Sequence, residues 1–494
     1  MANTRKNEAS IAGSKSVILT SVICGLILIG VIVWAVATKS ANALINKVAM
    51  TVGDKEISGV EFEYQYNEAI STFQTTYQDV IQYMGVDFEK DLSTQEYSEE
   101  QSWKDYFVEQ AVAALTERYL LFCAADEAGY VLSDEDKKAL DDEIASLKSM
   151  LSAYGISYSD YIKSIYGDEI TTKLFRDYNL INTTAYNYYT QVMDSLEIDA
   201  AALEAYYNEH KDDIDTVDFL FYQFAYTVPT DVEEGDESYK DEAKAKADAA
   251  LAAITDAASF NSAILAQLED AETELNTEAS NRFKDDMIAA LSEWLYDGAR
   301  VSGDKTVIEG NGGYFVLYFV ERVRPDYEAV NVRHILISPE EVEDVKDDEG
   351  NVDADATAAA EEKAMADAKV KADEVLKQWL DGEKTEDSFA ALAVSNSKDT
   401  GSAAYGGLYT HVLKGQMVEE FDSWIFDASR EVGDYEIVET SYGYHIMFFS
   451  GNDGIVWEAL AKSGVEAEEY EAYTEELEGK YEIVVYDEVI DLIG

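Results

Sequence analysis

The sequence is poor in three kinds of residue, and each shortage excludes a class of protein. Its two cysteines, Cys24 and Cys123, cannot build a disulfide framework. Its four histidines are too few and too scattered for a dedicated metal cluster, which argues against a zinc enzyme. Lys and Arg number 37 against 100 Asp and Glu, a formal net charge of -63. Such a surface repels phosphate backbones, so we expect no nucleic-acid partner.

Apolar residues are plentiful. They make up 47% of the 494 residues, enough to bury large cores, and the length is typical of about three domains. One stretch inside residues 16–38 is uncharged and almost entirely apolar over about 20 residues, the length of a membrane-spanning helix. The flank before it carries more basic than acidic residues. The positive-inside rule therefore predicts a cytoplasmic tail at 1–15, a single-pass anchor, and an extracytoplasmic remainder.

The sequence leaves two alternatives for this segment, a retained anchor and a cleaved signal peptide. Ala35–Ala37 and Ala41–Ala43 both have the small-x-small pattern of a signal cleavage site. The apolar run is longer than the roughly 7 to 15 residues of a signal peptide, so we favour a retained anchor. Cys24 lies inside the span without the small residues of a lipid-attachment site.

Residues 43–215 are predicted to form a helical domain. A short β pattern at Val48–Val52 and a second short strand lead to Ser58, which with Glu61 forms a Ser-x-x-Glu capping box that opens a helix. Apolar residues then recur at spacings of three and four. Further helices are expected at 106–127, 133–150, 157–166 and 201–210, and they contain Cys123 and His210, which we interpret as structural residues.

An internal repeat follows the helical domain. Residues 291–316 align without a gap to residues 421–446. The identical pairs are Trp294/Trp424, Asp297/Asp427, Arg300/Arg430, Gly303/Gly433, Asp304/Asp434, Glu309/Glu439, Gly313/Gly443 and Tyr314/Tyr444. Each copy opens with an apolar strand, at 217–226 and 330–338, followed by an Ala/Lys-rich helix. We therefore predict two consecutive domains of one α+β fold, at 216–325 and 326–452.

The two copies differ where chemistry is expected. The second has His334 in its opening strand and His445 in its closing strand, whereas the first has Phe315 in place of His445. The second also carries an acidic run at 340–355, interpreted as a solvated loop. Only the second copy is equipped for catalysis.

The remaining residues, 453–494, are predicted to form a helix and then a strand at 481–486. The two short strands of the helical domain would be marginal alone. We therefore expect the terminal strand to return and pair with Val48–Val52.

The second copy resembles the parvulin-type peptidyl-prolyl isomerase domain, and the chain order resembles the SurA and PrsA foldases. Five motifs in the right order over about 120 residues carry the resemblance: Val332-Arg333-His334-Ile335-Leu336, Phe389-Ala390-Ala391-Leu392-Ala393 with Ser397 and Asp399, Gly406-Gly407, Gly415-Gln416-Met417 with Phe421, and Tyr442-Gly443-Tyr444-His445-Ile446. The earlier copy is similar to the degenerate parvulin domain that some of these foldases carry. The resemblance implies a multidomain α+β chain with isomerase and chaperone activity, without cofactor or metal.

The resemblance also implies roles for individual residues. His334, Asp399 and His445 would be the catalytic group, with the two histidines adjacent at the floor of the site. Met417, Phe421 and Tyr409 would form the proline pocket, and Tyr442 would contact substrate. Asp399 would set a histidine tautomer or charge, with a loop-capping role as its alternative. Thr400 is an alternative position for that role.

Departures from the family pattern keep other interpretations open. The family commonly reads Gly-Gly-Asp-Leu-Gly where this chain has Gly406-Gly407-Leu408-Tyr409-Thr410, which alters the pocket wall. The acidic loop argues against a phosphorylated substrate, and His411 is expected to be exposed. The expected function is isomerisation of X-Pro bonds in unfolded exported polypeptides, with a homodimer left open. A non-enzymatic holdase is the alternative, and a cation-binding surface protein is a third, lacking an Asp-x-Asp-x-Asp-Gly loop.

Overall fold

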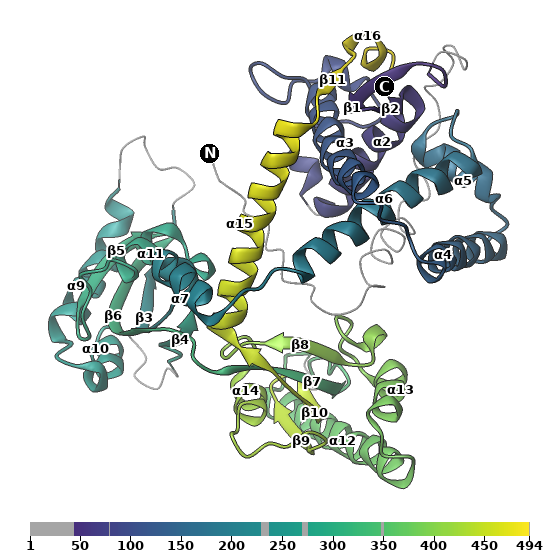
Figure 1. The fold of residues 1–494 in the computed structure, drawn as a ribbon. Helices are drawn as coiled ribbons and strands as arrows, with labels where there is room; N and C mark the ends of the chain where they lie inside the picture. Colours follow the sequence, from purple (N-terminus) through teal and green to yellow (C-terminus); the bar gives the residue numbers. More distant parts are fainter. Residues whose placement is uncertain (1–43, 79, 229–236, 269–274, 347–349, 494) are drawn as a thin grey trace. The chain divides into compact units, whose positions relative to one another are not determined.

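The computed structural model describes residues 44–78, 80–228, 237–268, 275–346 and 350–493, and it is a mixed α+β multidomain fold, as predicted (Figure 1). Two compact units divide the chain. The first holds the residues up to Ile198 together with Val465–Gly494, and the second holds Asp199–Gly464. Within the described ranges no helix is long and apolar enough to cross a membrane. The anchor predicted at 16–38 lies outside those ranges.

The first unit is mainly helical, as the sequence predicts. Its described elements are β1 (Val48–Val52), β2 (Lys55–Ser58), α2 (Gly59–Thr76), η1 (Ile81–Tyr83), η2 (Leu92–Thr94), α3 (Trp103–Glu127), α4 (Asp134–Ala153), α5 (Tyr158–Tyr166), α6 (Thr172–Asp194), β11 (Ile483–Val485) and α16 (Asp487–Ile490). Helix α6 was not predicted from the sequence. Helix α15 (Val456–Lys480) begins in the second unit and ends in the first.

The start of α2 corrects one expectation. Ser58 caps the helix by accepting a hydrogen bond from the Glu61 N–H at 3.2 Å, as the capping box predicts. The Glu61 side chain, however, turns inward and is only 3% exposed. Its Oε1 accepts a hydrogen bond from the Tyr119 hydroxyl of α3 at 2.7 Å. The glutamate therefore joins α2 to α3 within the core.

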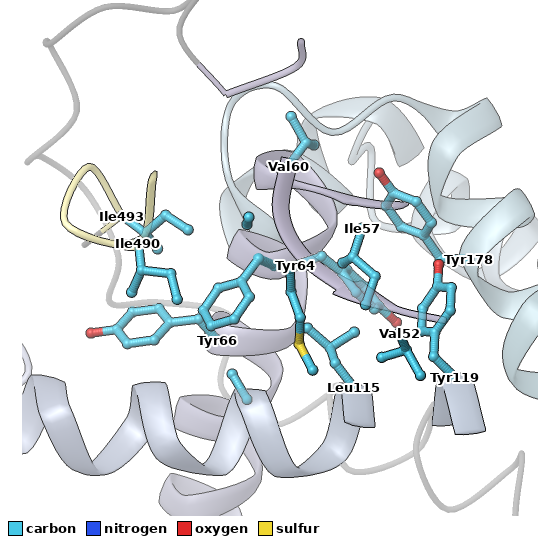
Figure 2. Close-up of a cluster of buried hydrophobic side chains, with 14 of the residues drawn as sticks. Val52, Ile57, Val60, Tyr64, Tyr66, Leu115, Tyr119, Tyr178, Ile490 and Ile493 are labelled. Atoms are coloured by element: carbon cyan, nitrogen blue, oxygen red, sulfur yellow. The ribbon is translucent and has the colours of Figure 1, made fainter. Parts of the chain in front are cut away.

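The end of the chain completes the sheet of the first unit. Strand β11 pairs antiparallel with β1, with Val484 opposite Thr51, so the predicted return of the terminal strand is confirmed. The three-stranded order is β11-β1-β2. Ile490 and Ile493 of the terminal segment are buried in the same hydrophobic cluster as residues of α2 and α3 (Figure 2). Residues from both ends of the described chain thus form one core.

The second unit contains both copies of the repeat. The first copy has β3 (Thr216–Ala225), η3 (Ser238–Lys240), α9 (Asp241–Ala253), η4 (Ala257–Ser259), α10 (Phe260–Leu265), β4 (Glu278–Arg282), η5 (Lys284–Asp286), α11 (Ala289–Leu295), β5 (Lys305–Gly310) and β6 (Gly313–Val323). The second has β7 (Glu328–Ile337), α12 (Ala354–Asp381), α13 (Glu386–Asn396), η6 (Ala403–Tyr405), β8 (Leu408–Val412), α14 (Glu419–Ile425), β9 (Tyr435–Thr440) and β10 (Gly443–Ile455). The sheet orders, β4-β3-β6-β5 and β8-β7-β10-β9, correspond strand for strand.

The repeat extends to side-chain contacts. In the first copy the Arg300 guanidinium lies 4.0 Å over the Trp294 ring, and in the second Arg430 lies 4.2 Å over Trp424. Each arginine also donates from Nε to the carbonyl oxygen of its tryptophan. The same cation–π contact therefore braces the same turn in both copies.

Helices α7 (Ala200–Glu209) and α8 (Lys211–Ile214) belong to the second unit, whereas the sequence analysis places them at the end of the helical domain. Their side chains explain the difference. Ile214 is buried with Trp457 and Ala461 of α15, and the Tyr207 ring meets the Trp457 ring edge-on at 5.6 Å. These apolar contacts hold α7 and α8 to the start of α15.

Candidate active site

The site of the second copy is built on its two central strands. His334 lies on β7 and His445 on the neighbouring β10, where Met447 is directly opposite His334 and His445 is opposite Leu336. Because side chains alternate between the faces of a strand, His334, Met447 and His445 project from one face of the sheet. That face is covered by α14, whose Phe421 is 2% exposed. Both histidines are buried, at 3% and 5% exposure.

The two imidazoles are directly joined. Nδ1 of His334 lies 3.0 Å from Nδ1 of His445, and the ring planes are inclined by only 17°. At the far side of His445, Nε2 lies 3.0 Å from the Thr440 hydroxyl of β9. The Thr440 oxygen also accepts the Tyr442 N–H at 3.1 Å. A hydrogen-bonded row therefore crosses β9, β10 and β7.

The row ends on the carboxylate of Asp399, which follows α13. Asp399 Oδ2 lies 2.8 Å from His334 Nε2 and accepts a hydrogen bond from the Tyr409 hydroxyl at 2.9 Å. Ser402 also donates to Oδ2 and lies 3.1 Å from His334 Nε2. The Gly401 N–H donates to Oδ1 at 3.1 Å. The predicted trio of His334, Asp399 and His445 is thus in contact.

The tautomers follow from the donors and acceptors around each ring. A carboxylate only accepts, so His334 carries a proton on Nε2 and, when neutral, accepts at Nδ1. His445 then donates from Nδ1 and accepts the Thr440 hydroxyl proton at Nε2. Burial lowers the pKa of His445 to about 4, and the adjacent His334 contributes to that lowering. His445 is therefore neutral at physiological pH.

Asp399 carries a negative charge at this site. The hydrogen bond from His334 is the largest cause that holds the pKa of Asp399 well below its usual range, and Ser402 and Tyr409 add to it. The hydrogen-bonded imidazole pair beside the carboxylate of Asp399 forms a polar floor without any proton transfer. Such a floor can stabilise a dipole in a bound substrate.

Apolar side chains flank this floor. The Phe421 ring meets both imidazoles edge-on, with centroids 5.4 Å from each. The Tyr409 ring lies 5.3 Å from His334. Tyr409 and Met417 are half-buried members of the same hydrophobic cluster as Phe421. The three predicted pocket residues thus lie together beside the histidines.

Three other predicted residues are placed differently. Tyr442 has a side chain that is 62% exposed, and it joins the site through its backbone N–H. Thr400 is exposed, so the structure selects Asp399 instead of Thr400 as the partner of the histidines. His411, predicted to be exposed, is half-buried in β8 at a positive φ of 54°.

Ser402 and Thr440 are site residues that the sequence analysis missed. Both are buried, at 1% and 4% exposure, and each hydrogen-bonds a histidine ring nitrogen. Thr440 precedes the Tyr442–Ile446 motif by two residues, and Ser402 follows Asp399 by three. Their position in the sequence, within a few residues of the family motifs, was the one feature that could have indicated them.

Gly407 of the Gly-Gly motif is required by close backbone approach. Its φ is +71°, and its carbonyl accepts the His334 N–H at 2.8 Å. A Cβ atom there would lie 2.1 Å from the His334 carbonyl oxygen. Only glycine fits, so this part of the family motif serves to hold the loop against β7.

The equivalent position in the first copy lacks the hydrogen-bonded row. By strand register Phe221 takes the position of His334 and Phe315 that of His445. Thr440 is replaced by Gly310, and a Cβ on Gly310 would lie 2.7 Å from the Phe315 ring. The larger ring thus occupies the space that the threonine side chain has in the second copy. Nothing in this apolar group can form the hydrogen-bonded floor.

In the described part of the chain, no three His, Cys, Asp or Glu side chains come together so as to hold a metal ion.

Comparison with known proteins agrees with this geometry. The family model of the PPIC-type PPIASE domain matches residues 315–450, which include the whole histidine row. The predicted resemblance of the second copy to the parvulin family is confirmed. The match begins in β6 of the first copy.

Among curated proteins, the foldase protein PrsA of Exiguobacterium sibiricum is 42% identical over 59 residues, which cover 12% of this chain and 19% of that protein. The foldase protein PrsA of Staphylococcus aureus is 39% identical over 82 residues, covering 16% and 24%. The chain thus spans about a fifth of the length of these relatives. The crystal structure of PrsA from Bacillus subtilis aligns with 79% of this chain and 92% of its own, at 14% identity and a TM-score of 0.26.

Proposed function

We propose that this chain is a peptidyl-prolyl cis–trans isomerase and chaperone for exported proteins, with the second copy as its catalytic domain. The observation that carries the proposal is the buried His334–His445 pair, hydrogen-bonded to Asp399, inside a segment that the model of the PPIC type matches. Rotating an X-Pro amide has a barrier of about 18 to 20 kcal/mol without catalysis. The reaction makes and breaks no covalent bond, so a site without nucleophile or metal is sufficient.

The pocket residues and the polar floor have separate roles. Phe421, Met417 and the Tyr409 ring offer an apolar cradle for the pyrrolidine ring of proline. The histidine pair and Asp399 favour the twisted amide over the planar one, because its charge distribution differs from that of the resonance-stabilised ground state. We assign His334 and His445 to positioning and local polarity instead of general base catalysis, because His445 stays neutral and its ring nitrogens are both engaged.

The helical first unit would hold unfolded exported chains, and residues 16–38 would anchor the protein with the bulk of the chain outside the membrane. Foldase protein PrsA relatives and the apolar run support this assignment. Labelling of intact cells with a membrane-impermeant lysine reagent tests it. Modification of lysines after residue 39 is expected, and their complete protection would contradict the proposal.

The catalytic test compares the full chain with a variant that copies residues of its own first repeat into the second. We expect the parent to accelerate cis-to-trans isomerisation of a proline tetrapeptide and the refolding of a proline-limited protein. His445→Phe with Thr440→Gly reproduces the pair Phe315 and Gly310, a combination that this fold already accommodates. This double variant is expected to fold and to lose the acceleration. A folded parent with background activity would overturn the proposal.

A non-enzymatic holdase is the second candidate. The apolar group of Phe221, Phe315 and Gly310 favours a non-catalytic role for the first copy, and Leu408-Tyr409-Thr410 alters the pocket wall of the second. This alternative predicts that the parent suppresses aggregation of an unfolded client while isomerising at background rate. Equal suppression by the parent and the double variant, with acceleration in the parent alone, would assign the two activities to different surfaces.

A further inference from the structure

The ring of Tyr409 forms part of the pocket wall, whereas its hydroxyl makes a separate contact behind the histidines. It lies on β8 opposite Val332 of β7, and its ring is tilted by 30° against the His334 ring at 5.3 Å. Its hydroxyl points past that ring to Asp399 Oδ2, 2.9 Å away. One side chain therefore contributes apolar surface to the site and a hydrogen bond to the group behind the histidines.

The carboxylate of Asp399 accepts an unusually large number of hydrogen bonds. Its Oδ2 accepts from His334 Nε2, from Ser402 and from Tyr409, while Oδ1 accepts the Gly401 N–H. A carboxylate can only accept, so all four bonds suit the ionised form. Protonating Asp399 would put a hydrogen where one of these donors now points. Each donor thus helps keep the carboxylate ionised.

The ionised carboxylate in turn determines where the His334 proton sits. With Oδ2 as an acceptor, His334 keeps its proton on Nε2, and Nδ1 is left to accept from His445. A protonated Asp399 would remove this preference, and the direction of the row from Thr440 to Asp399 would no longer be defined. The hydroxyl of Tyr409 therefore acts on the pair through Asp399.

We propose that Tyr409 is a positioning residue for the isomerase site, whose hydroxyl locks Asp399 as a carboxylate and thereby fixes the proton of His334 on Nε2. The inference rests on the proposed isomerase function for its catalytic consequence. The titratable groups that face Asp399 are His334 from β7 and Tyr409 from β8, with His445 of β10 facing it through His334. The described contacts of Asp399 include no lysine or arginine, so the hydroxyl donors take the place of a counter-charge.

The test is the pH dependence of catalysis by the full chain, in the parent and in Tyr409→Phe, which keeps the ring and removes only the hydroxyl. The acid limb of kcat/KM is expected to move up by about one pH unit, the shift that corresponds to losing one hydrogen bond to a charged group. Ser402→Ala, which removes another donor from the same oxygen, should shift the limb in the same direction. Tyr405→Phe is the matched control, because that ring is 74% exposed, and its profile should match that of the parent.

A second readout does not need activity. With four histidines in the chain, the ring ¹⁵N signals are few enough to assign, and the signals of His334 report its tautomer directly. In Tyr409→Phe, Asp399 should be protonated at a higher pH than in the parent, and the tautomer signals of His334 should report that change at the same pH as the kinetic limb. The signals of His210 serve as an internal reference. Tyr409→Leu repeats the measurement if the phenylalanine variant does not fold.

The outcomes separate the two claims. Superimposable pH profiles and unchanged His334 signals in a folded Tyr409→Phe variant would overturn the role of the hydroxyl. If the His334 signals shift in Tyr409→Phe but the parent does not isomerise proline, the positioning role is supported and the proposed function is rejected.

Discussion

Thr440 ends the histidine row, and its hydroxyl is the single described side-chain partner of His445 Nε2. Thr440→Val keeps the shape of the side chain but leaves that buried nitrogen without a donor. An unsatisfied buried polar atom costs about 1 to 3 kcal/mol. We therefore expect Thr440→Val to lower the unfolding free energy of the second copy by that amount, while Thr440→Ser restores most of it.

Hydrogen exchange of the β9 and β10 amides measures this effect in the full chain, because it reports local stability within a multidomain protein. Equal exchange in the valine and serine variants would show that the hydroxyl has no role.

Glu61 is a buried carboxyl whose behaviour depends on pH. Burial raises its pKa to about 7, against the opposing hydrogen bond from Tyr119 and the charge of Arg118. A carboxyl with a raised folded pKa stabilises the fold fully below its unfolded value, near 4.5, and that contribution is lost as pH rises through about 7. Glu61→Gln keeps the acceptor for Tyr119 without the charge. At pH 8 the variant should be more stable than the parent by about 1 to 3 kcal/mol.

Exchange rates of the α2 amides at pH 6 and pH 8 check this prediction. The parent should lose protection between the two values more than Glu61→Gln does. Glu63, whose pKa burial also raises to about 7, keeps part of the pH dependence in the variant. An identical loss of protection in both proteins would exclude an ionising Glu61.

These residues also show which parts of the site and the core could be predicted from the sequence. His334, His445 and Asp399 were predictable, because they lie in family motifs of recognisable order. Glu61 was predicted as a capping residue, which is correct for its backbone. Its side chain depends on Tyr119, 58 residues along the chain, and that contact follows from packing alone.

At the scale of elements, strand β5 of the first copy has a glycine where the Phe315 ring of β6 needs space. Gly310 ends β5 opposite Gly313 of β6, and an added Cβ would lie 2.7 Å from the Phe315 ring and 3.0 Å from Ile288. Gly310→Ala is expected to destabilise the first copy by about 1 to 3 kcal/mol through overpacking. Adding Phe315→Leu should relieve the clash and recover part of the loss.

Hydrogen exchange of the β5 and β6 amides measures the local stability of the first copy and so checks this coupling. Gly298→Ala is the matched control, because a Cβ there meets nothing within 4 Å, and it should change stability by less than about 0.5 kcal/mol. Additive effects of the Gly310 and Phe315 changes would contradict the packing argument.

The elements were predictable to different degrees. The shared fold of the two copies could be predicted from the repeat, and the return of β11 from the apolar β-rich run near residue 483. The order of the strands in each sheet could not, and comes from the structure. Helix α6 (Thr172–Asp194) was missed, because its Thr, Asn and Tyr residues have modest helix propensity. Its packing against α3 stabilises it, as Arg118 donates from Nε to Asn182 at 3.1 Å. Tertiary contacts here outweigh local preference.

At the scale of the whole molecule, the first unit depends on the last residues of the chain. Ile493 is fully buried in the core of that unit, whereas its neighbour Leu492 is 48% exposed. Ile493→Ala should lower the stability of the first unit by about 2 to 5 kcal/mol, the range for a large apolar side chain removed from a core. Leu492→Ala, one residue away, should change it by less than about 0.5 kcal/mol.

Exchange of the β1 and α2 amides measures the first unit, and proline isomerisation measures the second. Isomerase activity should stay the same in both variants, because the histidine row lies in the other compact unit. Equal destabilisation by both substitutions would mean that the terminal segment does not pack as described.

The pairing of β1 with β11 has a consequence for the order of events in the cell. A ribosome makes β1 first and β11 last, and most of the chain separates the two strands. The second unit lies wholly between them and can complete its contacts earlier. The first unit cannot complete its sheet until β11 has been synthesised. A product that ended before β11 would contain every element of the second unit but would lack one strand of the first unit's sheet. The unit whose synthesis begins first is therefore the one whose contacts are completed second.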